Sequence, residues 1–231
     1  MKIANLSVFL PAYNEEANIS RTVSNIYKII PQFAENFEVL VINDGSQDNT
    51  AAVLAKLSGQ YSNLRVVTHP KNRGYGAALK SGFANCRYEY VFFTDGDGQF
   101  QAEEIKKLVD LVPGCDIAAG FRQKRSDPLH RKINAKAYNF LVRLLFGLAV
   151  KDIDCAFKII KKDVLRAVDL KSETQFISAE LLIKSKKLGF AIKQAGVVHL
   201  ARQAGKATGN KPMVVVKSFY ELFKLWKELK K

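Results

Sequence analysis

Two aspartates separated by a single glycine are the residues in this sequence with the clearest capacity for chemistry. Asp95 and Asp97 follow an apolar run at residues 90–93, and Gly96 lies between them. On a glycine-containing turn, the two carboxylates can converge on one hard divalent cation. Mg²⁺ and Mn²⁺ prefer oxygen ligands and commonly bridge carboxylates to substrate phosphates. An ordinary Asp-Gly turn is the alternative interpretation, and the preceding apolar run favours the metal site.

Further polar residues follow other apolar runs. Asp44 ends the second run and could accept hydrogen bonds from a base or a ribose, whereas helix capping explains Ser46. Residues 72–76, Asn-Arg-Gly-Tyr-Gly, have the form of a loop that enters a helix N-terminus, where phosphate binds favourably. Residues 11–16 form a third cluster after the first run. Polar clusters at several strand ends indicate one site rather than unrelated turns.

The elements that must position these residues alternate between β-branched apolar runs and helical patterns through the first 120 residues. This rhythm predicts an α/β fold with a mostly parallel central sheet and helices on both faces. Ligands bind such sheets beyond the carboxyl ends of the strands. The expected strands are 7–10, 39–42, 64–67, 90–93 and 195–200. The expected helices begin after residue 14 and otherwise cover about 47–57, 76–85, 102–112, 130–146, 179–187 and 212–229.

The charge of the chain is divided unequally between its halves. Residues 1–120 carry 11 basic and 13 acidic side chains, residues 121–231 carry 25 and 9, and the formal net charge is +14. The second half should therefore attract anions such as phosphorylated substrates, nucleic acid or an acidic membrane surface. A nucleic-acid-binding module would interleave basic residues with base-stacking aromatics. The ordered acidic clusters of the first half argue against that class.

The composition excludes several other classes of protein. Hydrophobic residues make up 48% and charged residues 25% of the chain, which excludes disorder of the chain as a whole. Cys86, Cys115 and Cys155 show neither a disulfide framework nor zinc-ligand spacing. The sequence shows no secretory leader, no spanning run of ~18–20 apolar residues, no repeat and no low-complexity linker. We therefore expect one domain over residues 1–231, cytoplasmic, with at most peripheral membrane contact.

Taken together, the ordered motifs resemble family 2 of the glycosyltransferases, which implies the GT-A fold. The motifs that carry this resemblance are Pro11-Ala12-Tyr13-Asn14-Glu15, Asn43-Asp44-Gly45-Ser46, Asn72-Arg73-Gly74 and Asp95-Gly96-Asp97-Gly98-Gln99. The second half is similar to the polyprenyl-phosphate sugar transferases, such as dolichyl-phosphate mannose synthase. The looser matches there are Gly120-Phe121-Arg122, Leu129-His130-Arg131, Asp154 through Phe157-Lys158, and His199 with Arg202-Gln203-Ala204-Gly205-Lys206.

The resemblance implies a nucleotide-sugar donor, of the GDP-mannose or UDP-glucose type, across the strand ends, and inversion at the sugar. The donor-binding residues that it implies are Pro11, Tyr13, Glu15, Asp44 and Gly74. Asp95 and Asp97, helped by Gln99, would hold Mg²⁺ or Mn²⁺ with the diphosphate. Arg122 and Arg131 would hold the acceptor's phosphate, and Arg202 would neutralise the leaving diphosphate, tasks that suit arginine.

The type of acceptor decides whether a catalytic base is needed. A polyprenyl phosphate is already an anionic nucleophile and needs positioning more than proton removal, and the basic second half favours it. A glycan or protein hydroxyl would need deprotonation, for which Asp154 or Asp152 is the candidate. Asp154 could equally serve as the partner of an arginine or lysine near the site.

The pattern at about 212–229 predicts a basic amphipathic helix. Apolar side chains recur near a 3.6-residue period at Val215, Phe219, Leu222, Phe223, Trp226 and Leu229, with lysines in other directions. A helix of this kind can lie in a bilayer interface, or it can pack on its own core or on a partner subunit. Close relatives often carry C-terminal transmembrane helices, which this sequence does not show. A membrane surface, a separate membrane-protein partner and a homo-oligomer therefore all stay open.

Overall fold

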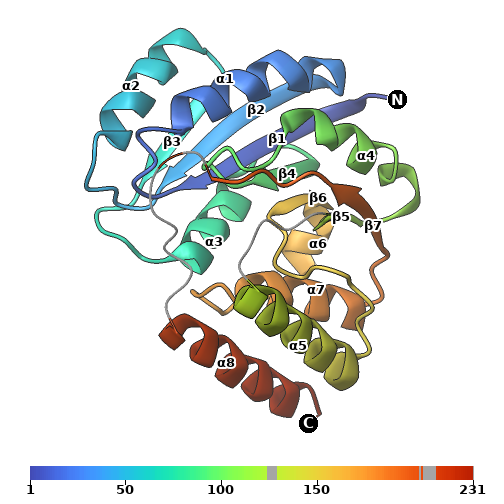
Figure 1. Ribbon diagram of the computed structural model, residues 1–231. Coiled ribbons are helices and arrows are strands. Elements are labelled where there is room, and N and C mark those ends of the chain that lie inside the picture. The colour runs from blue at the N-terminus through green and yellow to red at the C-terminus, as the bar shows by residue number, and fades with distance from the viewer. Residues whose placement is uncertain (124–128, 203, 205–211, 231) are drawn as a thin grey trace.

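The computed structural model describes residues 1–123, 129–202, 204 and 212–230 (Figure 1). Its strands are β1 (Ile3–Ala12), β2 (Ala34–Asn43), β3 (Leu64–Thr68), β4 (Tyr90–Thr94), β5 (Ile117–Arg122), β6 (Phe157–Lys161) and β7 (Ile192–Val197). Its α-helices are α1 (Ile19–Ile29), α2 (Thr50–Gln60), α3 (Tyr75–Asn85), α4 (Ile105–Val109), α5 (Leu129–Phe146), α6 (Lys162–Ala167), α7 (Ile177–Lys187) and α8 (Pro212–Lys230). Its 3-10 turns are η1 (Ile30–Gln32), η2 (Ala102–Glu104) and η3 (Val112–Gly114).

In the described part of the chain, seven strands form a single sheet in the order β3-β2-β1-β4-β6-β5-β7. Strands β1 to β4 pair in parallel, as do β5 and β7, whereas β6 runs antiparallel to both of its neighbours. The carboxyl ends of β1, β2, β3 and β4 therefore meet at one edge of the sheet, where a ligand site is expected. The mostly parallel α/β sheet predicted from the sequence is confirmed.

Helices cover both faces of the sheet, and each face has its own hydrophobic core (Figure 1). Successive side chains of a strand point to opposite faces, so Val8 and Leu10 pack with α1, α2 and α4, whereas Phe9 packs with α3, α5, α7 and α8. Burial on both sides explains the continuous apolar runs at 8–10 in β1, 39–42 in β2 and 91–93 in β4. The rigid scaffold formed in this way presents the loops at the carboxyl edge.

Strands β5 and β6, helix α6, the division of one helix and the position of β7 differ from the sequence expectations. Strands β5 and β6 were not predicted, because β5 contains small residues and Gly120, and the fully buried Lys158 lies within β6. The helix expected over 102–112 is divided into η2, α4 and η3. Pro113 lacks the N–H that would bond to the Val109 carbonyl, and its ring would crowd that carbonyl, so α4 ends at Val109. The strand expected at 195–200 lies earlier, as β7.

Helices α5 and α8 lie side by side at the side of the molecule opposite α1 and α2 (Figure 1). The rings of Tyr138 on α5 and Phe219 on α8 meet edge to face, with their centroids 5.4 Å apart. The apolar side of α8 is buried against the core at Leu222 and Leu225. Within the described residues, the helices are all too short or too polar to cross a bilayer.

Candidate active site

The turn after β4 brings the two aspartates to the carboxyl edge of the sheet. The Gly96 N–H donates to the carbonyl of Pro11 at the end of β1 (3.3 Å), and the Thr22 hydroxyl donates to the Gly96 carbonyl (3.2 Å). A Cβ at Gly96 would lie 3.0 Å from the Pro11 oxygen. Glycine between the aspartates therefore allows the turn to pack closely against β1 and α1.

The two aspartates differ in their surroundings. Burial and the nearby charge of Asp97 raise the pKa of Asp95 to about 7, although the Tyr75 hydroxyl donates to its Oδ1 atom (3.3 Å). Asp97 accepts a hydrogen bond from the backbone N–H of Gln99 (3.0 Å). Excess negative charge in a buried setting favours a bound cation. The described residues contain no cluster of three His, Cys, Asp or Glu side chains that could hold a metal. Two carboxylates do not fill the coordination shell of Mg²⁺ or Mn²⁺, so a cation bound by Asp95 and Asp97 would also take substrate or water oxygens as ligands.

A single guanidinium connects the aspartate turn to the loop after β1. Arg202 donates through Nη1 to Asp97 (3.3 Å) and through Nη2 to Glu15, and through Nε to the carbonyl of Ala204 (2.8 Å). Burial raises the pKa of Glu15, and hydrogen bonds from Asn18 and Arg202 oppose this effect. Residues predicted as donor contact, metal ligand and leaving-group arginine thus meet in one cluster.

The side-chain amide of Gln99 contacts the segment after β7, whereas its backbone N–H donates to the Asp97 side chain. Its amide Nε2 donates to the Leu200 carbonyl (2.9 Å), and the Leu200 N–H donates to the Gln99 carbonyl (2.8 Å). Phe100 and His199 continue this pairing, with ring centroids 4.9 Å apart. Gln99 therefore ties the segment that carries Arg202 to the aspartate turn, and its role as a metal ligand stays a prediction.

Asp44 is buried at the end of β2 and is held by groups of the protein itself. Its Oδ1 accepts from the backbone N–H of Arg73 (2.9 Å), and its Oδ2 accepts from that of Gly74 (2.8 Å). The imidazole of His69 lies 2.6 Å from Oδ1. Gly74 has a φ of 95°, in the region that favours glycine, and directly precedes α3. The predicted contact of Asp44 with a base or a ribose stays a prediction, and its visible task is to hold the loop before α3.

The loop after β1 is locked to the loop after β2. The Asn14 N–H donates to the Ser46 hydroxyl (3.0 Å), and the Asn14 side chain accepts from the Gln47 N–H (2.8 Å). Asn14 has a φ of 55°, a left-handed conformation that asparagine tolerates. Pro11 is buried and Tyr13 is half-buried beside this junction. Their predicted contacts with the nucleoside stay predictions.

Arg122 and Asp154, predicted on the acceptor side, lie close enough to the aspartate turn that their charges affect the pKa of Asp95 and that of Tyr75. Arg122 forms a two-pronged ion pair with Asp152, through Nε (2.6 Å) and Nη2 (2.8 Å). Burial would lower the pKa of Arg122, but these hydrogen bonds and the charge of Asp152 raise it above its ordinary value. Asp154 is exposed, and its charge helps to raise the pKa of Tyr75. Arg131 lies in α5, and its side chain falls outside the described part of the chain.

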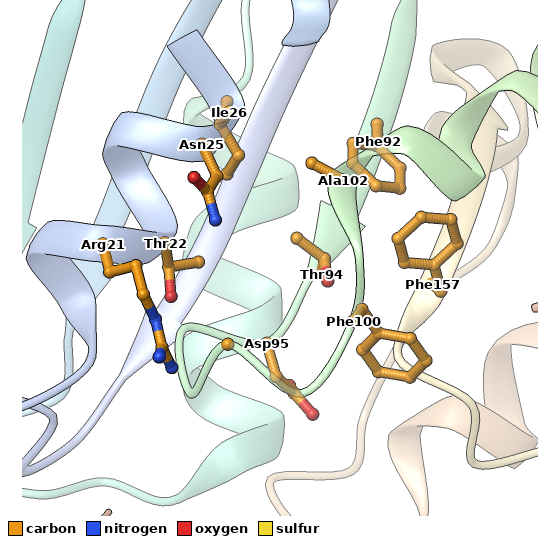
Figure 2. Close-up of a pocket in the computed structure, with 11 residues that line it drawn as sticks. Arg21, Thr22, Asn25, Ile26, Phe92, Thr94, Asp95, Phe100, Ala102 and Phe157 are labelled. Carbon is orange, nitrogen blue, oxygen red and sulfur yellow. The ribbon is translucent and has the colours of Figure 1, made fainter. Parts of the chain in front are cut away.

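A pocket opens beside the aspartate turn, between α1 and the aromatic side chains of the sheet (Figure 2). Figure 2 shows Arg21 and Thr22 on one side of it, Phe100 on the other and Asp95 at its edge. Sequence reasoning assigned no role to this pocket, to His69 or to Asn18. Tyr75 was predicted only as part of the loop at residues 72–76. The position of His69 directly after β3 was the available signal, because ligands and their supports gather at strand ends.

Comparisons with known proteins identify the family of the chain. Residues 7–169, more than half of the chain, match the family described as Glycosyl transferase family 2. The chain is 30% identical over 165 residues to an undecaprenyl-phosphate 4-deoxy-4-formamido-L-arabinose transferase of Pseudomonas fluorescens (strain SBW25). That match covers 71% of this chain and 48% of the relative, so the chain spans about half the length of this curated relative.

Solved structures show the same fold. A glucosyl-3-phosphoglycerate synthase from Mycobacterium tuberculosis, crystallised with phosphoglyceric acid, superposes with a TM-score of 0.74 at 24% identity. A crystal structure of that synthase with Mn²⁺, UDP and glucosyl-3-phosphoglycerate superposes with a TM-score of 0.72, also at 24% identity. Both matches cover 94% of this chain and 79% of the other. The GT-A fold is thereby confirmed, and the chain belongs to glycosyl transferase family 2.

Proposed function

We propose that this chain transfers a sugar from a nucleotide-sugar donor to a polyprenyl phosphate, with inversion at the sugar. The observation that carries the proposal is the cluster in which Asp95, Asp97, Glu15 and Arg202 meet at the carboxyl edge of the sheet. Its carboxylates suit a metal ion bound to a diphosphate, and its guanidinium suits the phosphate itself. The undecaprenyl-phosphate acceptor of the Pseudomonas relative supports a polyprenyl phosphate here, and the UDP and Mn²⁺ bound in the mycobacterial structure support a nucleotide donor with a divalent metal.

The aspartate turn fits a divalent cation by its chemistry. Asp95 and Asp97 supply only oxygen ligands, which Mg²⁺ and Mn²⁺ prefer. Their mutual repulsion, visible in the raised pKa of Asp95, would be relieved by a positive charge. When bound, the cation would stabilise the charge that develops on the leaving diphosphate.

Other residues of the chain would bind the leaving diphosphate, the donor phosphates and the acceptor phosphate. Arg202 would turn from its carboxylate partners to the diphosphate and hold it as it leaves, because guanidinium binds phosphate through paired hydrogen bonds. The N-terminal end of α3, held by Asp44, would lie beside the donor phosphates. Arg122 and Arg131 would receive the acceptor phosphate, although Arg122 must then share its charge with Asp152.

The face formed by α5 and α8 would contact the membrane in which the acceptor lies. Phe140, Leu144, Tyr220 and Phe223 are exposed apolar side chains on these two helices. The exposed lysines of α8 that accompany them are Lys217, Lys224, Lys227 and Lys230. Apolar side chains interleaved with lysines are typical of helices that bind anionic bilayer surfaces.

The membrane contact is tested by sedimentation with vesicles. Phosphatidylglycerol vesicles should carry the protein down and phosphatidylcholine vesicles should not. The variant Lys227→Glu on α8 should weaken the binding, whereas Lys56→Glu, an exposed lysine on α2, should not. Equal binding of both variants would place the contact elsewhere.

The activity is tested with a panel of donors and two acceptors. Purified protein is incubated with GDP-mannose or UDP-glucose, Mg²⁺ or Mn²⁺, and either undecaprenyl phosphate or a sugar alcohol. A lipid-linked product that requires the metal and disappears in Asp97→Asn supports the proposal. Glycosylation of the sugar alcohol alone would favour a hydroxyl acceptor, with Asp154 as the base.

A further inference from the structure

A buried line of hydrogen bonds runs from α3 to the end of β2. His69, directly after β3, places Nδ1 2.6 Å from Asp44 Oδ1 and Nε2 2.8 Å from the Ser81 hydroxyl. His69 is 5% and Asp44 3% exposed. A carboxylate only accepts hydrogen bonds, so Nδ1 must carry the hydrogen. This fixes both the imidazole and the carboxylate that it contacts.

The carboxylate of Asp44 in turn fixes the loop that begins α3. It receives the N–H groups of Arg73 and Gly74, and the neighbouring Gly45 leaves no room for a Cβ against Lys71 and Asn72. The next residue, Tyr75, reaches back to the aspartate turn with its hydroxyl 3.3 Å from Asp95 Oδ1. The line therefore joins His69 to the carboxylate that the proposed function gives to the metal.

Removal of the imidazole would leave Asp44 with two backbone donors and an empty space on its third side. A buried carboxylate that loses a donor is destabilised unless it moves or admits water. Movement of Asp44 would shift the Arg73 and Gly74 N–H groups that bond to it. Tyr75, the next residue of the chain, would then shift as well. The position of Asp95 in the donor site would change, because Tyr75 contacts Asp95 directly and no other described element lies between them.

We propose that His69 is a positioning residue of the donor site, which acts through Asp44 and Tyr75 on the geometry around Asp95. This inference rests on the proposed function, because it requires that the site binds a nucleoside diphosphate with a divalent cation. It also assigns to Asp44 a supporting task in this chain. His69 itself touches neither the donor nor the metal.

The test is binding of UDP and of GDP, each with Mn²⁺, measured by titration calorimetry without any acceptor. His69→Ala should weaken the binding of the nucleoside diphosphate by about tenfold, the usual result of losing one hydrogen bond to a buried charge. His69→Asn should recover most of this loss, since its amide places an N–H close to the position of Nδ1. Tyr75→Phe should weaken binding by a smaller factor, because it removes only the last contact.

Glu38→Gln is the matched control for a loss of stability. Glu38 is also a buried carboxylate of β2 that accepts a backbone N–H, but its partners are Ser7, Arg65 and Arg87, away from the site. It should lower the melting temperature without changing the affinity for the nucleoside diphosphate. In the enzyme assay, His69→Ala should raise the KM for the donor and leave the KM for the acceptor unchanged.

The outcomes separate this inference from the proposed function. If the wild type binds neither UDP nor GDP with Mn²⁺, the proposed function is wrong and the inference falls with it. If the wild type binds and His69→Ala binds equally well, only the positioning role is wrong. The positioning role is also wrong if His69→Asn binds the nucleoside diphosphate as weakly as His69→Ala does. It is likewise wrong if Glu38→Gln weakens this binding as much as the His69 variants do.

Discussion

The carboxylates of Glu38 and Asp95 show how the interior of the sheet differs from its carboxyl edge. Glu38 on β2 receives hydrogen bonds from the Ser7 hydroxyl, the Arg65 guanidinium and the Arg87 N–H, each at 2.7 Å. Burial would raise its pKa, but these donors outweigh burial and hold the pKa of Glu38 below its ordinary value. Asp95 at the edge is half-buried, and its pKa is raised to about 7 by its partial burial and by the charge of Asp97.

The difference lies in what surrounds each carboxylate. Around Glu38, donors of the protein compensate the charge, so the carboxylate stabilises the fold. Around Asp95, a second carboxylate adds to the charge, and the Tyr75 hydroxyl compensates it only in part. Folding has thus left negative charge at the edge that a cation and a diphosphate can use. A carboxyl group whose pKa is shifted in this way is a mark of a functional site.

Removal of charge from the aspartate turn should have the largest effect. Asp97→Asn should lower the rate of sugar transfer by about 10²–10³-fold, the scale seen when one electrostatic contact to a developing charge is lost. Its melting temperature should stay the same or rise, since the repulsion with Asp95 is removed. Initial rates with saturating Mn²⁺ and thermal unfolding measure the two quantities. A full rate in Asp97→Asn would show that the turn is only structural.

Removal of charge at Glu38 should lower the stability of the fold and leave the activity unchanged. Glu38→Gln should lower the free energy of unfolding by about 2 kcal/mol, because Arg65 and the Arg87 N–H lose a charged acceptor. The rate of transfer per folded molecule should not change. Urea unfolding followed by circular dichroism measures the loss. A loss of activity without a loss of stability would remove the contrast between the two regions.

Substitution of arginine by lysine should distinguish the regions more finely. Arg202 contacts both Asp97 and Glu15, which a single ammonium group cannot reproduce. Arg202→Lys should therefore lower the rate of transfer by about tenfold. Arg65→Lys, the matched change beside Glu38, should leave that rate unchanged. Equal rates for the two variants would mean that Arg202 acts only through its charge.

The sequence alone predicted the parts of the fold and site that depend on local pattern. Continuous apolar runs predicted β1 to β4, and the polar residues after them do gather at one edge. The pairing of Asp95 and Asp97 on a glycine turn was also predicted. These features succeed because strand burial and turn chemistry leave their mark within a few neighbouring residues.

Features that depend on distant partners could not be predicted in this way. The contact of Arg202 with Glu15 joins residues 187 positions apart, and that of Arg122 with Asp152 joins residues 30 apart. Strand β6 was missed because Lys158 interrupts its apolar pattern, yet its Nζ is satisfied by the carbonyl of Ile153 (3.1 Å) and by that of Cys155. Only the folded arrangement shows these partners.

The smallest effect, and the most direct test of the contrast, is the dependence of stability on pH in metal-free protein. A raised pKa means that folded Asp95 holds its proton while the unfolded chain has lost it. Stability should therefore fall as the pH rises from about 4 to 7, and Asp95→Asn should remove this decline. Glu38 has a lowered pKa, so its contribution is present above its ordinary value of 4.5 and is lost as the pH falls below it.

The two variants should therefore diverge in opposite directions. Relative to the wild type, Asp95→Asn should gain stability as the pH rises towards neutrality. Glu38→Gln should lose stability relative to the wild type as the pH rises through the acid range, and it should stay less stable at higher pH. Melting temperatures in EDTA from pH 3.5 to 8 measure both curves, and each 1 kcal/mol should shift them by about 2–4 °C in a chain of this size. Parallel curves would show that the two carboxylates have similar surroundings after all, because a common slope requires that folding perturbs both pKa values in the same direction.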